Sequence, residues 1–158
     1  MVAQRTFSRL GRDLALTRYT GTASSVPLDN ADSWGTLDLA LAASATGLTD
    51  FAVTAERSNL GQALILRLLT PQGSLAPLGH PAYGSRLYQL IGGLNNEVAR
   101  NLARLYTIEA VGQEPRVREL LNVRIEAAPG SPDTIRIAFD VLPLDDDNPL
   151  SLGLEVTL

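Results

Sequence analysis

The most distinctive chemical feature of the sequence is a proline flanked by opposite charges, Glu114-Pro115-Arg116. Proline fixes its own backbone angle φ and cannot continue a helix, so the three residues predict a stiff corner between two structural elements. The planar guanidinium of Arg116 suits paired hydrogen bonds to a carboxylate. Two interpretations therefore stay open: a local ion pair within the chain, and a charged docking site for another protein.

Two other clusters could perform chemistry, but both favour simpler explanations. Asp145, Asp146 and Asp147 offer oxygen ligands for a hard cation. They stand between prolines, however, which is typical of a solvated turn. His80 is the single histidine and could titrate near neutral pH. No serine or aspartate accompanies it at a triad-like spacing, so we expect a structural role for His80 and no metal site.

A glycosidase would need two carboxylates in contrasting environments on either side of a cleft. The acidic residues that could be nominated are Glu97, Glu109, Glu114 and Asp140, but their placement singles out no pair. With one tryptophan, four tyrosines and three phenylalanines, the chain also has few aromatic platforms for sugars. The sequence therefore predicts a protein that is not an enzyme and has no catalytic residues.

The residue types that are missing exclude most other chemistry. The 158-residue chain has no cysteine and one histidine, which excludes disulfides, thiolate metal sites and histidine-rich metal centres. All 13 basic residues are arginine, so neither Schiff-base chemistry nor a phosphate-binding Walker lysine is available. The net charge of -4 argues against non-specific binding to nucleic acid. We expect no cofactor and no nucleic-acid partner.

The length suits one domain, since domains typically contain roughly 100–200 residues. We expect residues 1–35 to form an N-terminal arm and loop, because residues 20–35 are rich in Thr, Ser, Asp, Asn and Gly. Residues 36–158 are expected to form a single domain. No apolar run approaches the roughly 20 residues of a membrane-spanning helix. The chain is therefore predicted to be a cytoplasmic protein at the time of assembly, without membrane insertion.

Two segments show the 3.6-residue period of helices. The first runs from an N-cap at Ser58 to Thr70, where Pro71 ends it. The second covers residues 95–111, with Gly112 as the residue after its end. Its expected inward stripe consists of Leu94, Val98, Leu102, Leu105 and Ile108. Between the two helices, residues 71–84 predict an ordered, turn-rich loop, and residues 85–91 predict a short helix.

Alternating apolar and polar residues, the two-residue period of strands, mark two other parts of the chain. Residues 37–42 and 51–55 predict a hairpin. Segments 121–127, 135–141 and 150–158 predict an antiparallel meander with one apolar face. Helices are the natural cover for this face. The predicted fold is therefore α+β: a C-terminal three-stranded antiparallel meander and an N-terminal hairpin, packed against two main helices.

The last predicted strand, 150–158, raises the question of a sheet edge. At an edge, its unpaired backbone groups would be a template for a strand of another chain. Solitary proteins often protect such an edge with lysine, proline or a bulge, and this strand contains neither lysine nor proline. The alternative is an ordinary strand that is paired within its own subunit or covered by the N-terminal arm.

Three motifs occur in a distinctive order. Residues 59–73 (NLGQALILRLLTPQG) are followed by residues 78–87 (LGHPAYGSRL) and, after an intervening helix, by Glu114-Pro115-Arg116. In this order the motifs resemble the phage baseplate wedge family of gene product 25 and the W protein. Relatives of that family include TssE of type VI secretion and the wedge subunits of extracellular contractile injection systems. The resemblance covers residues 58–158, whereas residues 1–57 match only loosely.

The resemblance implies a structural, non-enzymatic part of a contractile tail, present in six copies per particle. It implies that Glu114, Pro115 and Arg116 dock onto the core bundle of the other wedge subunits. It also implies that the β-rich end begins the first sheath ring by strand addition. The candidate residues for this contact are Leu150, Leu152, Leu154, Val156 and Leu158. The expected partners are wedge and sheath subunits, with spike or tube-hub proteins as further candidates.

Two alternatives to this function are kept. Some members of the family carry a lysozyme label, so the first is a peptidoglycan-degrading enzyme. The second is a self-contained adaptor that forms its own homo-oligomer. The sequence does not distinguish a phage from a type VI apparatus or an extracellular injection system.

Overall fold

The C-terminal third of the chain forms the predicted antiparallel meander. The computed structural model describes residues 10–19, 25–27, 36–43, 47–144 and 146–158. Strands β8 (Val117–Ala127), β9 (Thr134–Pro143) and β10 (Leu150–Thr157) make a sheet in the order β10-β9-β8. Alternate residues of β9 and β10 are buried, as the two-residue period predicts. Strand β8 begins earlier than expected and has register shifts at Arg118 and Leu121.

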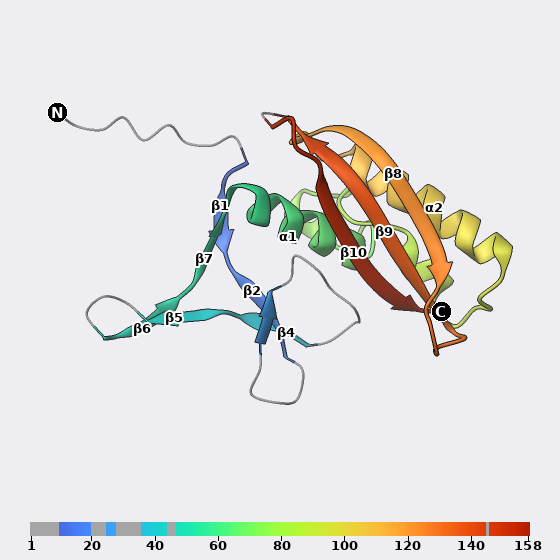
Figure 1. The fold of residues 1–158 in the computed structure, drawn as a ribbon, viewed down its shortest axis with the longest axis horizontal. Coiled ribbons are helices and arrows are strands. Elements are labelled where there is room, and N and C mark those ends of the chain that lie inside the picture. The colour runs from blue at the N-terminus through green and yellow to red at the C-terminus, as the bar shows by residue number, and fades with distance from the viewer. Residues whose placement is uncertain (1–9, 20–24, 28–35, 44–46, 145) are drawn as a thin grey trace.

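Two helices cover the apolar face of this sheet (Figure 1), so the α+β fold is confirmed. They are α1 (Glu56–Leu69) and α2 (Glu97–Gly112). Helix α1 ends before Thr70-Pro71 as predicted, but the expected N-cap at Ser58 is wrong. The helix starts three residues earlier, directly after a strand, and its N-cap residue Ala55 makes no side-chain cap bond. The core between helices and sheet includes Leu60, Leu64, Leu68, Leu87, Ile135, Ile137, Phe139, Leu154 and Val156.

Helix α2 presents a different face to the core from the one predicted. Asn96 caps its start by accepting a hydrogen bond from the Ala99 amide at 2.9 Å. The helix continues through Gly112, which is therefore not the residue after its end. Of the expected inward stripe, Leu94, Val98, Leu105 and Ile108 are exposed, and only Leu102 packs against the core. The residues that face the core are Ala103, Tyr106, Thr107, Ala110 and Val111.

This error has a physical reason. The predicted stripe and the observed buried face of α2 both consist of residues spaced three or four apart. This spacing alone therefore could not decide which of the two faces is buried. The buried face of α2 combines the small residues Ala103 and Ala110 with the larger Tyr106 and Val111. Packing against β8 and the rest of the core, rather than the spacing of apolar residues, distinguishes this face from the predicted one.

The N-terminal part of the chain forms short two- and three-stranded ribbons that project from α1 (Figure 1). Its strands are β1 (Arg12–Leu14), β2 (Leu16–Tyr19), β3 (Ser25–Pro27), β4 (Thr36–Leu39), β5 (Leu41–Ala43), β6 (Thr49–Phe51) and β7 (Val53–Ala55). The predicted hairpin is confirmed between β5 and β6. The flanking strands instead pair elsewhere, β4 with β2 and β7 with β1.

Three alanines join these ribbons. The Ala15 amide donates to the Ala52 carbonyl, Ala52 donates to Ala40, and Ala40 donates to Ala15, each at 2.8 Å. These three backbone hydrogen bonds form a closed ring, and the three ribbons meet at this ring. Strands β1 and β2 lie before residue 35 and pair with β7 and β4 beyond it. The proposed domain boundary at residue 35 stays a prediction.

The loop between α1 and α2 is ordered and rich in turns. It contains two short 3-10 helices, η1 (Ala76–Leu78) and η2 (Leu87–Leu90), the second within the predicted helix 85–91. The Gln72 amide donates to the Ser85 carbonyl, and the Ser85 amide donates to Thr70, which ties both ends of the loop together. Within the ranges the structure describes, no helix is both long and apolar enough to span a membrane.

Candidate functional site: a charged corner and an open sheet edge

Glu114 lies between α2 and β8, where the proline turns the chain, and its side chain is buried. Only 5% of the side chain is exposed. Its Oε2 accepts a hydrogen bond from Arg67 Nη2 at 3.2 Å, and its Oε1 accepts one from Arg116 Nε at 2.6 Å. Because both carboxylate oxygens are engaged within the chain, the local ion pair that the sequence left open is present.

Arg67 links this carboxylate to the loop that follows α1. It stands in the last turn of α1, and its side chain is almost as buried as that of Glu114. The guanidinium carbon lies 4.4 Å from the centroid of the Tyr83 ring, a cation–π contact. Its Nε has no hydrogen-bond acceptor among the described residues. Arg67 was not among the residues predicted from the sequence, although an arginine within an otherwise apolar helical run is a usable signal for a buried ion pair.

Arg116 forms the solvent-facing side of the corner. Besides Glu114, it binds the carbonyl of Leu10 through Nη1 at 3.1 Å. About a quarter of its side chain is exposed, 26%, and Pro115 is exposed as well. The part of the motif that another protein could reach is therefore Pro115 with Arg116, whereas Glu114 acts as an internal anchor.

The charges around Glu114 decide its protonation. Burial alone would raise the pKa of this carboxyl. The hydrogen bonds and charge of Arg116, together with the charge of Arg67, outweigh burial and hold the pKa of Glu114 below its usual value. Glu114 is therefore ionised at neutral pH, which a general acid would not be. Burial is also the main cause that raises the pKa of Tyr83, so this ring stays neutral beside Arg67.

Strand β10 occupies one edge of the C-terminal sheet. Within the described part of the chain it pairs with β9 alone. Leu152, Leu154, Val156 and Leu158 are buried in the core of their own subunit, and Leu150 is half-buried. Of the five predicted contact residues, four therefore direct their side chains into their own core, and only Leu150 is partly accessible. What the edge can offer is its backbone.

The pairing pattern identifies the backbone groups that face away from β9. The Leu158 amide donates to the Asp133 carbonyl at 2.7 Å, so this residue directs its amide toward the β9 side. Direction alternates along an antiparallel strand. Leu152, Leu154 and Val156 therefore bond to β9. The residues that direct N–H and C=O groups outward are Ser151, Gly153, Glu155 and Thr157.

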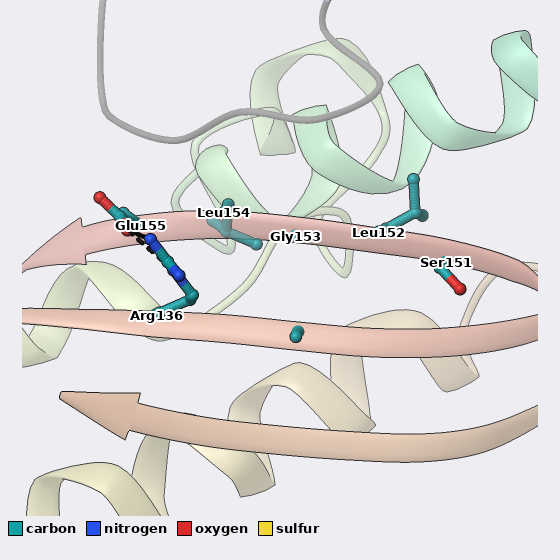
Figure 2. Close-up of a pocket in the computed structure, with 7 residues that line it drawn as sticks. Arg136, Ser151, Leu152, Gly153, Leu154 and Glu155 are labelled. Carbon is teal, nitrogen blue, oxygen red and sulfur yellow. Dashed lines mark hydrogen bonds and ion pairs between the residues drawn. The ribbon is translucent and has the colours of Figure 1, made fainter. Parts of the chain in front are cut away.

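A hollow of about 470 Å³ lies along this edge. It is lined by side chains of β9 and β10, and Figure 2 shows Arg136 and Glu155 pointing toward each other at one end of it. Arg136 donates to Glu155 through Nε at 2.9 Å and Nη2 at 2.6 Å. The hollow was not predicted from the sequence, because its lining residues come together only when β9 and β10 pair.

The other candidate residues are held in local contacts. Asp146 pairs with Arg57 and Asp147 with Arg118, as in a solvated turn braced by arginine; Asp145 lies outside the described residues. Across the described ranges, no three metal-binding side chains gather in one place. His80 is exposed, and its backbone groups bond to Leu75 and Tyr83.

The carboxylates nominated for a glycosidase also have separate partners. Glu109 pairs with Arg86, and Asp140 accepts hydrogen bonds from Ser151 at 2.6 Å and Asn122 at 3.2 Å. The Ser151 hydrogen bond is the main cause that lowers the pKa of Asp140. Glu97 stands in the first turn of α2. Asp140 lies on the outer face of the sheet, and Glu114 lies buried at the end of α2.

Comparison with known proteins bears on the fold. No family model and no curated protein matches the chain. Among solved structures, a Geobacter sulfurreducens protein described as a "putative tail lysozyme" is similar, with a TM-score of 0.53 at 19% sequence identity. The match covers 61% of this chain and 86% of that chain. At this identity the likeness concerns the fold alone, so the chain has a fold of the kind found in that protein.

Proposed function

We propose that this protein is a structural subunit of a contractile tail or injection system, in the position of a baseplate wedge subunit with six copies per particle. In this role the Pro115–Arg116 side of the corner docks on the helical core bundle of other wedge subunits. The β10 edge begins sheath assembly by accepting a strand from a sheath subunit. Spike or tube-hub proteins are further partners.

The observation that supports the proposal most is the outer edge of β10, with which no strand of the described residues pairs, in a fold shared with a protein described as a tail lysozyme. Its outward backbone groups can bind an incoming strand whatever side chains that strand has. Such contacts are multiplied in a ring, so a modest affinity per subunit is sufficient for stable assembly.

The Glu114-Pro115-Arg116 corner sets the orientation of this subunit relative to its wedge partner. Glu114 and the Leu10 carbonyl hold two donor groups of Arg116, and its Nη2 has no acceptor among the described residues. This nitrogen can donate to a carboxylate or carbonyl of a wedge partner. Because the guanidinium is already held in place, it loses little conformational freedom on binding. Its fixed direction also means that a partner must be aligned with it to accept the hydrogen bond.

The experiment that tests the proposal is reconstitution. The purified chain is mixed with the wedge and sheath subunits encoded near its gene, and complexes are measured by size-exclusion chromatography and electron microscopy. Growth of the sheath from rings that contain this chain is the expected result. Sheath growth at the same rate without the chain would contradict the proposal.

A peptidoglycan-degrading activity is the second candidate, because the similar solved protein is described as a tail lysozyme. The carboxylates of this chain disfavour it, since Glu109, Glu114 and Asp140 are each engaged with separate partners. Release of soluble fragments from cell-wall material would support this candidate if substitution of Glu97 or Glu114 removed the activity.

A further inference from the structure

The hollow beside β10 lies over a pair of small residues. Gly153 of β10 and Ala138 of β9 are direct cross-strand partners, and both line it. The neighbouring cross-strand pairs on the same face are larger and polar. Arg136 with Glu155 borders the pair on one side, and Ser151 with Asp140 borders it on the other. The outer face of the sheet is therefore interrupted by a gap between two polar walls.

The gap is placed where a partner strand would lie. Gly153 is one of the residues that direct N–H and C=O groups away from β9. A strand added to β10 places one residue directly opposite Gly153, with its side chain on the same face as the gap. Glycine has no side chain to pack against that residue, so the contact must come from the partner.

We propose that the β10 edge selects a partner strand with an aromatic side chain opposite Gly153, and that this ring packs in the hollow over Gly153 and Ala138. The inference rests on the strand addition proposed above and adds the chemistry of the residue that is recognised. Aromatic side chains are the residues that cover edge glycines in sheets. The volume of about 470 Å³ exceeds many times the roughly 30 Å³ that one water occupies, so a ring fits.

The residues that border the hollow, Arg136 and Glu155, favour an aromatic ring over an anionic side chain. Arg136 gives two hydrogen bonds to Glu155, so a carboxylate on this side already balances its charge. About half of the Arg136 side chain remains exposed, 50%. The flat face of a guanidinium that is bound edge-on stays available for stacking against a ring. An acidic residue opposite Gly153 would instead meet Glu155 and be repelled.

The test uses the 158-residue chain with a strand tethered behind Leu158 through a flexible Gly/Ser linker, which keeps the strand at a high effective concentration. The strand alternates Thr and Val and has Phe, Leu, Ala or Asp at its central position. Amide hydrogen exchange at Ser151, Gly153, Glu155 and Thr157 reports pairing along the edge. We expect protection about 5-fold greater with Phe than with Ala, from the size of aromatic pair energies. Leu should lie between them and Asp below Ala.

Substitution of the hollow provides the control. Gly153→Thr keeps the outward N–H group and fills the gap with a residue that suits a strand. In this variant we expect the tethered strands to protect the edge with no preference for Phe. The matched variant Thr157→Val, on the same edge outside the hollow, should keep the preference. Thermal unfolding without a tether checks that both variants fold.

The outcomes separate this inference from the proposed function. Equal protection by Phe and Ala strands, or a preference for Phe that survives Gly153→Thr, would overturn the aromatic site and leave strand addition intact. No protection by any tethered strand would overturn strand addition itself, and the inference with it.

Discussion

Arg67 Nη2 lies 3.2 Å from Glu114 Oε2, an ion pair that joins the last turn of α1 to the residue that leads out of α2. Both side chains are almost fully buried. A buried ion pair is costly to form because two charges leave water, but it is also costly to break, since the remaining charge stays buried. This relationship makes Glu114 an element of the fold as well as part of a candidate docking corner.

Substitution of Glu114 should destabilise the protein. Glu114→Ala removes the acceptor of Arg67, whose Nε is already without a partner among the described residues. We expect a loss of about 3–5 kcal/mol in the free energy of unfolding, measured with urea. The double variant Glu114→Gln with Arg67→Met should recover most of this loss. A loss below about 1 kcal/mol for Glu114→Ala would mean that water reaches the pair.

The Glu114 carboxylate should also contribute to acid unfolding. Its pKa is lower in the folded chain than its usual value of 4.5. The ionised form therefore stabilises the fold, fully above about pH 4.5, and this contribution is lost as the pH falls through the lowered pKa of the folded state. We expect the difference in unfolding free energy between the wild type and Glu114→Gln to be constant near neutral pH and to shrink below pH 4.5. A difference that grows in acid would contradict the assignment.

Arg116 is the better residue for testing the docking corner. Since Arg67 still pairs with Glu114 and part of the Arg116 side chain is exposed, Arg116→Ala should reduce stability by about 1–3 kcal/mol, less than Glu114→Ala. We expect it to abolish co-purification with wedge partners. Glu114→Ala is a weaker test of docking, because the Glu114 side chain is buried and its loss also affects the fold. Normal assembly of a folded Arg116→Ala variant would refute the docking role.

The edge of β10 can be blocked by one substitution. The Ser151 amide points away from β9, so Ser151→Pro removes an outward donor and leaves the bonds to β9 intact. We expect this variant to fold and to lose sheath initiation in the reconstitution assay. Ser151→Ala, which keeps the amide and loses the hydroxyl bond to Asp140, is its matched control. Deletion of residues 150–158 is less informative because it removes buried core residues.

Gly84 should be intolerant of any side chain. Its φ is +107°, and an added Cβ would lie 2.5 Å from the Thr70 carbonyl oxygen. Gly84→Ala is expected to cost about 3 kcal/mol or more, because backbone strain and a clash act together. Gly79→Ala is the control, since it has a similar φ of +85° and open space around it. It should cost about 1–2 kcal/mol. Equal melting temperatures for the two variants would contradict the close approach of the loop to α1.

The sequence by itself determined the elements with a clear local signal. Along β9 and β10 buried residues alternate with more exposed ones, because one face of the sheet is covered and the other is not, and the meander follows from the short connections between the strands. Thr70-Pro71 ended α1 because proline restricts the residue before it. The corner at Pro115 followed from proline in the same way.

Only the tertiary structure decided which groups meet. Two faces of α2 had helical spacing, and only packing against the rest of the core fixed the buried one, which includes Ala103, Tyr106 and Ala110. Arg67 and Glu114 are separated by 46 intervening residues, and no local pattern pairs one charge with another over that distance. The hollow at Gly153 exists because the register of β10 against β9 places Ala138 directly opposite Gly153. Local energies fix the shape of each element, whereas burial and register, which depend on contacts distant in sequence, determine the surfaces that a partner can use.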